Sequence, residues 1–193
     1  MNALKNLTDL RLIELVESNH EGAIAELLDR YKSKFYTAAY LLVRDRYLAE
    51  DLFQDACIKI IQSIRNGKYK EDGKFLPWAM RITRNLCYDY LRVAKRTPKV
   101  TLPDGQDLFA ILDMGEQTAE DRIMNMESGK KVRQMLEFIP QEQREVIVLR
   151  MYGNLSFKEI AELTQVGINT ALGRMRYGLL ILRKLFDEKG ILL

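Results

Sequence analysis

Residues 139–176 read IPQEQREVIVLRMYGNLSFKEIAELTQVGINTALGRMR, and this stretch decides the fold. Pro140 suits the first turn of a helix, and Gly153 can end that helix in a left-handed conformation. Ser156 and Glu159 form a capping box that begins a second, short helix. The turn TQVG then leads into a longer, basic helix. Two helices joined by a tight turn, the second of them basic, indicate a helix-turn-helix that binds DNA.

The rest of the chain also shows helical rather than alternating spacing of its apolar residues. This spacing predicts helices at 8–18, 21–44, 46–65, 75–95, 118–138, 140–152, 156–163 and 168–187. We therefore predict an all-α protein of two small helical domains joined by a flexible acidic linker, the second being a helix-turn-helix four-helix domain. The predicted boundaries are 1–96 for the N-terminal domain, 97–119 for the linker and 120–193 for the C-terminal domain.

The linker prediction rests on residues 97–117, TPKVTLPDGQDLFAILDMGEQ, which hold two of the four prolines and a Pro-Asp-Gly turn signal. The net charge of +3 is unevenly distributed along the 193 residues. It is +4 for residues 1–96, −5 for 97–121 and +4 for 122–193. Two mildly basic blocks therefore flank an acidic connector, an asymmetry that the total charge conceals.

Several classes of protein are excluded by what the sequence lacks. The first residues have no continuous apolar core of a signal peptide and no later stretch is as long as a membrane span, so we predict a cytoplasmic protein without membrane insertion. Cys57 and Cys87 have no CxxC spacing and His20, near a helix start, is the single histidine, which predicts reduced structural thiols and no metal site. Since no carboxylate cluster, Gly-rich phosphate loop or nucleophile–histidine arrangement occurs, we predict no catalytic residue, no cofactor and no enzymatic activity.

The predicted helix 46–65 has an apolar stripe and a second face where isoleucines lie among acids and amides. The stripe comprises Leu52, Phe53, Ala56, Ile60 and Ile64. The second face comprises Asp51, Gln54, Asp55, Ile58, Ile61 and Gln62. An apolar centre ringed by polar groups is typical of a protein interface. The alternative is a wide apolar stripe in a tightly packed bundle.

The predicted helix at 78–96 divides into an apolar face and a basic face with aromatic rings. The apolar face comprises Ala79, Ile82, Leu86, Tyr90 and Ala94. The basic face comprises Trp78, Arg81, Arg84, Asn85, Tyr88, Asp89, Arg92, Lys95 and Arg96. Bases interleaved with rings and an amide can hold phosphates while stacking on nucleobases, which favours nucleic-acid binding over a merely solvated charged face.

In the last predicted helix, the expected core stripe is Ala171, Leu172, Met175, Leu179, Leu182 and Phe186. Helix-turn-helix proteins read base edges from the N-terminal part of this helix. That assigns base readout to Ile168, Asn169, Thr170, Gly173, Arg174 and Tyr177, and phosphate contacts to Arg176, Arg183 and Lys184. Glycine weakens a helix, so Gly173 indicates a close approach either to DNA or to a packed neighbour helix.

Three stretches together resemble the signatures of extracytoplasmic-function sigma factors. They are AEDLFQDACIKI (49–60), FLPWAMRITRNLCYDYLRVAKR (75–96) and the opening stretch 139–176, in the order that this family has. The resemblance covers nearly the whole chain. It implies a protein that directs RNA polymerase to promoters, with an acidic linker that threads toward the RNA exit path. Gln165 departs from the family at a turn position where glycine is common.

The resemblance and the residue patterns together assign three surfaces. The surface that docks on the clamp coiled coil of core RNA polymerase comprises Asp51, Gln54, Asp55 and Ile58. The −10 surface, which includes the loop at 66–74 that captures a flipped base, comprises Lys68, Lys70, Lys74, Trp78, Arg81, Arg84, Asn85, Tyr88, Asp89, Arg92 and Arg96. The −35 surface comprises Ile168, Asn169, Thr170, Gly173, Arg174, Arg176, Tyr177 and Lys184.

The implied partners are therefore promoter DNA and core RNA polymerase, through the clamp and the flap of its large subunits. An anti-sigma factor is a common partner in this family, although nothing in the sequence identifies one. The alternative function is a stand-alone helix-turn-helix repressor or activator. That alternative explains the C-terminal motif but leaves the faces of the helices at 46–65 and 78–96 without a task.

Overall fold

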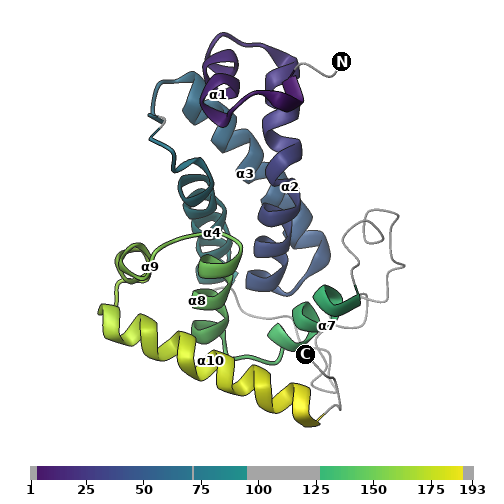
Figure 1. Cartoon of the computed structure of the whole chain (residues 1–193), viewed down its shortest axis with the longest axis vertical. Helices are drawn as coiled ribbons and strands as arrows, with labels where there is room; N and C mark the ends of the chain where they lie inside the picture. Colours follow the sequence, from purple (N-terminus) through teal and green to yellow (C-terminus); the bar gives the residue numbers. More distant parts are fainter. Residues whose placement is uncertain (1–3, 71, 95–126, 189–193) are drawn as a thin grey trace.

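The computed structural model describes residues 4–70, 72–94 and 127–188, and every regular element within these ranges is helical (Figure 1). The bounds are η1 Leu4–Asn6, α1 Asp9–Glu17, α2 Glu21–Val43, α3 Arg46–Arg65, α4 Phe75–Ala94, α7 Glu127–Leu136, α8 Gln141–Met151, α9 Phe157–Thr164 and α10 Ile168–Glu188. The helices predicted from apolar spacing are confirmed where they fall in these ranges. The predicted linker and residues 118–126 of one predicted helix lie outside the described residues.

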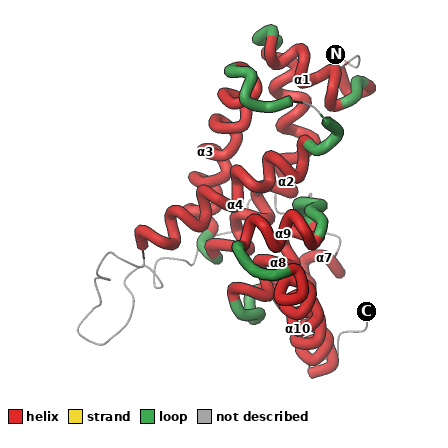
Figure 2. The backbone as a smooth tube through the Cα atoms, turned by 90° about the vertical axis from the view of Figure 1, so that its left-hand side faces the viewer, coloured by secondary structure: helices red, strands yellow, loops and turns green. Residues whose placement is uncertain are grey.

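The described helices form two groups that are in contact. Helices α1 to α4 make the N-terminal bundle, with α2, α3 and α4 packed on one another. In the second group α10 packs against α8 and α9, and it crosses α8 at a steep angle (Figure 1; Figure 2 gives the view from the side). Helix α8 also packs against α2, so it lies at the boundary between the C-terminal domain and the N-terminal bundle. An all-α fold of two domains is thereby confirmed.

Side chains at the helix starts satisfy backbone N–H groups that have no partner inside the helix. His20 is the N-cap of α2, and its Nδ1 accepts a hydrogen bond from the Ala23 N–H at 3.2 Å. His20 is exposed, and its predicted position near a helix start is confirmed. The predicted capping box of α9 is also confirmed: the Glu159 N–H donates to Ser156 Oγ at 3.2 Å, and the Ser156 N–H donates to Glu159 Oε2 at 2.8 Å.

Gly153 does not end α8 in a left-handed conformation, so that prediction is wrong. The left-handed residue is Asn154, with φ of 55°, while α8 ends at Met151. A β-carbon on Gly153 would lie 2.7 Å from the backbone oxygen of Leu149 and 2.6 Å from Cγ of Met80 in α4. Glycine is therefore required here for close approach, both within the C-terminal domain and between the two domains.

The buried stripe of α10 differs from the predicted one. Leu172 and Leu179 are 43% and 48% exposed, whereas Gly178 is buried. A β-carbon on Gly178 would lie 2.7 Å from Cδ1 of Ile147, so α10 approaches α8 closely at this glycine. Apolar periodicity misses this because glycine carries no apolar side chain to count.

The predicted stripe of α4 is also partly wrong, since Tyr90 and Ala94 are exposed. The helix buries Met80, Thr83 and Cys87 instead. The Thr83 hydroxyl donates to the carbonyl oxygen of Ala79 at 3.1 Å, which makes its burial inexpensive. Burial raises the pKa of the Cys87 thiol to about 12, and both described cysteines are free thiols as predicted.

We expect Gly153→Ala and Gly173→Ala to change stability in opposite directions. The first places a methyl group against the Leu149 backbone oxygen, which cannot move aside, and overpacking costs about 1–3 kcal/mol. The second meets nothing within 4 Å and gains up to about 1 kcal/mol of helix propensity. Urea unfolding followed by circular dichroism measures both. Equal effects of the two substitutions would contradict this account of Gly153.

Candidate nucleic-acid and protein interfaces

The second face predicted for α3 lies on the surface of the protein. Asp51, Gln54 and Asp55 are exposed, and Ile58 is 53% exposed. The predicted stripe packs inward, with Phe53 half-buried edge-on against Tyr36. The members of the stripe that are buried are Leu52, Ala56, Ile60 and Ile64. Ile58 is therefore not part of a wide core stripe, and the structure favours the interface interpretation of this face over the packing one.

The loop between α3 and α4 is anchored by an aromatic side chain that the sequence analysis did not select. Tyr69 is 5% exposed, and its ring centroid lies 4.2 Å from that of Trp78 and 5.9 Å from that of Phe75. This ring contact fixes the loop on the first turn of α4. The three loop lysines remain exposed around it: Lys68, Lys70 and Lys74. In the sequence, a single tyrosine between two lysines in a polar segment gives little indication that its side chain is buried.

One edge of α4 presents exposed polar groups at helical spacing. Asn85, Asp89 and Arg92 are exposed, and Arg92 Nη2 lies 3.0 Å from Asp89 Oδ1. An exposed pair of this kind contributes little to stability, so both groups are available to a ligand. Arg96 and Lys95, predicted on the same helix, lie outside the described residues.

Three members of the predicted basic face of α4, Arg81, Arg84 and Tyr88, meet the C-terminal domain, and the Arg81 side chain remains 40% exposed. Arg84 Nη2 lies 2.6 Å from Glu145 Oε1 of α8, and Arg81 Nη2 lies 3.2 Å from Glu159 Oε1 of α9. The Arg84 guanidinium also lies over the ring of Tyr88, 4.1 Å from its centroid. Burial, and after it the neighbouring Glu145 carboxylate, raise the pKa of Tyr88. The structure thus separates these three residues from the exposed edge of α4.

The recognition helix α10 presents most of the predicted −35 residues to solvent. Those that are exposed are Ile168, Asn169, Thr170, Arg176, Tyr177 and Lys184. A β-carbon on Gly173 would have no neighbour within 4 Å, so helix packing does not explain this glycine. Gln165, in the turn before α10, has a left-handed φ of 56°, the conformation that glycine adopts most easily.

Arg174 is less free than its neighbours on α10. Its side chain is 18% exposed, and its Nη2 lies 2.7 Å from Glu142 Oε2 at the start of α8. A guanidinium has five N–H donors, so one carboxylate contact leaves others for a base edge. Glu142, which the sequence analysis did not select, fixes the direction of this arginine.

Family models match both halves of the chain. Sigma-70 region 2 matches residues 27–97, and Sigma-70 region 4 matches residues 129–171. The chain is 29% identical over 178 residues to the ECF RNA polymerase sigma factor SigW of Bacillus subtilis, which is 89% of this chain and 93% of that protein. The chain belongs to the extracytoplasmic-function sigma factors.

Other sigma factors are similar over the same length. The ECF RNA polymerase sigma-E factor of Escherichia coli K12 is 26% identical over 179 residues, 89% of this chain and 90% of that protein. The fold is shared with the solved structure of CnrH in complex with the cytosolic domain of CnrY, at 20% identity and a TM-score of 0.59, covering 93% of this chain and 97% of that one. It is also shared with RpoE in complex with the anti-sigma factor NepR from Bartonella quintana, at 19% identity and a TM-score of 0.57, covering 83% and 94%.

Membership in this family confirms the prediction of a transcription factor without enzymatic activity. Within residues 4–70, 72–94 and 127–188 no group of three or more His, Cys, Asp or Glu side chains could hold a metal ion. No helix in the same ranges is long and apolar enough to cross a membrane.

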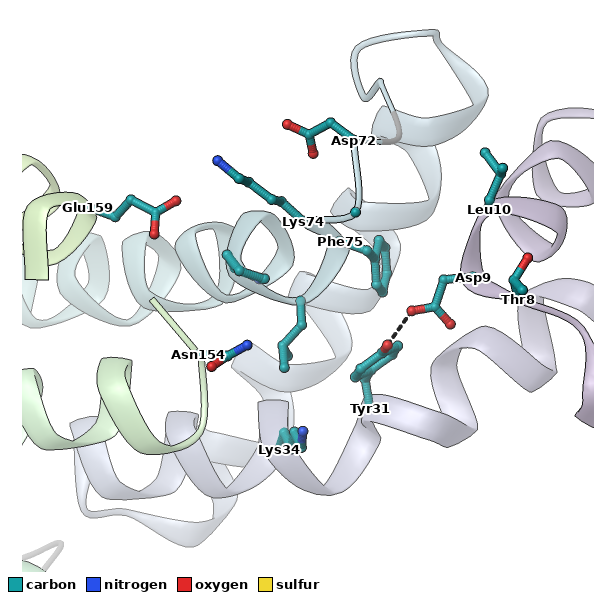
Figure 3. A pocket seen from close by; sticks show the side chains of 13 residues that line it. Thr8, Asp9, Leu10, Tyr31, Lys34, Asp72, Lys74, Phe75, Asn154 and Glu159 are labelled. Carbon is teal, nitrogen blue, oxygen red and sulfur yellow. Dashed lines mark hydrogen bonds between the residues drawn. The ribbon is translucent and has the colours of Figure 1, made fainter. Parts of the chain in front are cut away.

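The sigma factor has a cleft of about 760 Å³ where α1, α2, the loop before α4 and the start of α9 meet (Figure 3). Tyr31 donates a hydrogen bond to Asp9 at one end, and Lys74 and Glu159 lie toward the other (Figure 3). Glu159 takes part in the capping box and the Arg81 pair. Hydrogen bonds from the Ser156 N–H and then the Ser156 hydroxyl, followed by the charge of Arg81, lower the pKa of its carboxyl group. The cleft therefore lies along the contact between the two domains.

The C-terminal domain of the sigma factor has a second, apolar groove of about 790 Å³ between α7, α8 and α10. Its lining includes Leu136, Met151, Tyr152, Leu179 and Phe186. Met151, which lines the groove, is 67% exposed. Among the described residues, the groove therefore presents an exposed apolar surface on this domain.

Proposed function

We propose that this sigma factor binds core RNA polymerase through the exposed face of α3 and directs transcription from promoters with −10 and −35 elements. The observation that carries the proposal is Ile58, an apolar side chain half exposed among the acids Asp51 and Asp55. A repressor that binds an operator unaided has no use for such a face, whereas a docking surface requires an apolar centre with a polar rim. Work on core polymerase requires a cytoplasmic location.

The promoter contacts are assigned to two separate surfaces. The −10 surface is α4 with the loop anchored by Tyr69, where lysines, rings and an amide suit an unpaired strand. The −35 surface is the N-terminal half of α10, which suits a major groove. We also propose that the N-terminal domain spans residues 1–96, the linker 97–119 and the C-terminal domain 120–193. The apolar groove between α7, α8 and α10 is a candidate contact for the polymerase flap.

Run-off transcription with purified core polymerase and promoter-selected DNA tests the function. A transcript that begins at one promoter position, and only when the chain is present, is the expected result. Tight sequence-specific binding of the free protein to duplex DNA at physiological salt, without any transcript, would instead support the stand-alone repressor.

We expect Asp51→Arg combined with Ile58→Glu to abolish association with core polymerase. Both side chains are exposed, so the fold remains, while loss of an interface hot spot costs on the order of 2 kcal/mol or more. Pull-down of core polymerase measures the effect. Glu50→Arg, at an exposed neighbour outside the proposed docking surface, is the control and should bind normally. If the double variant is recovered with polymerase at wild-type levels, the docking assignment is wrong.

We expect Arg174→Ala and Arg176→Ala to affect promoter binding in different ways. If Arg174, held by Glu142, contacts a guanine, its loss relaxes preference at one base pair of the −35 element by about 1–3 kcal/mol. Arg176 is exposed and assigned to phosphate, so its loss weakens binding evenly and lowers the salt slope by about one unit. The measurement is holoenzyme binding to single-base −35 variants at several salt concentrations. An unchanged preference at every position for Arg174→Ala would show that Arg174 only holds the backbone.

A further inference from the structure

We propose that Glu145 and Glu159 of the C-terminal domain form an intramolecular latch over the part of the basic face of α4 that holds Arg81, Arg84 and Tyr88, so that the free sigma factor withholds these three residues from promoter DNA. The inference rests on the proposed function for its assignment of α4 to the −10 element. We define the latch as two ion pairs, Arg84 with Glu145 and Arg81 with Glu159.

The first pair is nearly closed to solvent. The side chains of Arg84 and Glu145 are 15% and 5% exposed, and Glu145 Oε1 accepts from both Nε and Nη2 of the arginine, at 2.7 and 2.6 Å. Tyr88 lies under the same guanidinium. A phosphate would need the same N–H donors, because carboxylate and phosphate compete for the fork of an arginine. Arg84 cannot serve both at once, because its third nitrogen, Nη1, donates to Asn85 Oδ1 at 3.3 Å and no pair of donors remains for a phosphate.

The second pair extends the latch toward the loop. Arg81 Nη2 donates to Glu159 Oε1, while the other oxygen of Glu159 holds the start of α9 through Ser156. Glu159 is therefore fixed in place by its own helix before it meets α4. The side chains of Arg81 and Glu159 are 40% and 20% exposed, so this second pair is more accessible to solvent than the first.

Two features of the same contact oppose closure. Arg144 of α8 is 3% exposed and donates to carbonyl oxygens of residues 137 and 139, and burial, followed by the charge of Arg44 at the C-cap of α2, lowers its pKa. The buried Nε atoms of Arg144 and Arg81 have no hydrogen-bond partner within the described residues. Unpaired buried donors are costly, so the closed arrangement depends on the two ion pairs for part of its stability.

The test compares two double variants that remove the same charge. Glu145→Gln with Glu159→Gln opens the latch, and glutamine at 159 retains the capping box. Glu162→Gln with Asp187→Asn is the control, since both residues are exposed and outside the latch. Small-angle X-ray scattering of the free protein measures its radius of gyration. Fluorescence anisotropy measures affinity for a single-stranded −10 oligonucleotide.

We expect the latch variant to become more extended and to bind the oligonucleotide about tenfold more tightly, because a closed state reduces the apparent affinity by the fraction that is open. The control variant should match the wild type in both measurements. An unchanged radius of gyration in the latch variant, or an equal gain in affinity for the control, would overturn the latch. So would an extended variant whose affinity for the oligonucleotide does not rise.

A charge exchange guards against a simple folding defect. Arg84→Glu alone should extend the protein, and Arg84→Glu with Glu145→Arg should restore the compact form, with circular dichroism reporting helix content for each. Failure of the exchange to restore compactness while helix content is normal would count against a specific pair. Because scattering needs neither DNA nor polymerase, the latch can be confirmed even where run-off transcription shows that the proposed function is wrong.

Discussion

Helix α8 is buried over the whole of residues 144–149, and the arrangement of both domains depends on how that burial is satisfied. It packs on α10 through the close contact at Gly178, and it packs against α2 of the other domain. A helix enclosed in this way must pair any charge it carries, because an unpaired buried charge is far more costly than an unpaired exposed one. Arg144 and Glu145 are the two charged residues in this segment.

Each of these charges fixes a different part of the molecule. Arg144 donates to the carbonyl oxygen of Ile139 at 3.0 Å, which ties the connection between α7 and α8 to its own domain. Glu145 has its partner in α4, so its pairing with Arg84 holds the two domains together. Tyr40 of α2 adds a further contact across the boundary, donating to Glu137 Oε1 at 2.8 Å. The domain contact is therefore polar at its edges, with Met80 against Gly153 as an apolar contact between them.

The sequence was sufficient for local structure because caps and apolar spacing act over a few residues. The Ser156 capping box could be read from spacing alone, whereas spacing left open whether Ile58 of α3 faces solvent or the core. The pairing of Arg84 could not, since its partner Glu145 is 61 positions away and charge patterns do not encode distant contacts. The role of Gly153 was predicted wrongly and Gly178 was not selected, for a related reason. Each glycine leaves room for a neighbouring side chain that only the tertiary structure identifies. Tyr69 was missed because its ring is buried by Trp78 across a loop whose composition is polar.

The contrast between α3 and α4 has a consequence for the order of events in promoter recognition. Asp51 and Ile58 are exposed in the same arrangement that covers Arg84. Docking of α3 on polymerase therefore requires no separation of the domains, whereas contact of the full α4 face with an unpaired strand requires the latch to open. The α10 face, with Tyr177 at 65% exposure, is also open in this arrangement. Of the three proposed surfaces, only the −10 surface is partly covered in the free protein, at Arg81, Arg84 and Tyr88, and this is the surface that has no substrate until polymerase and promoter are both in place.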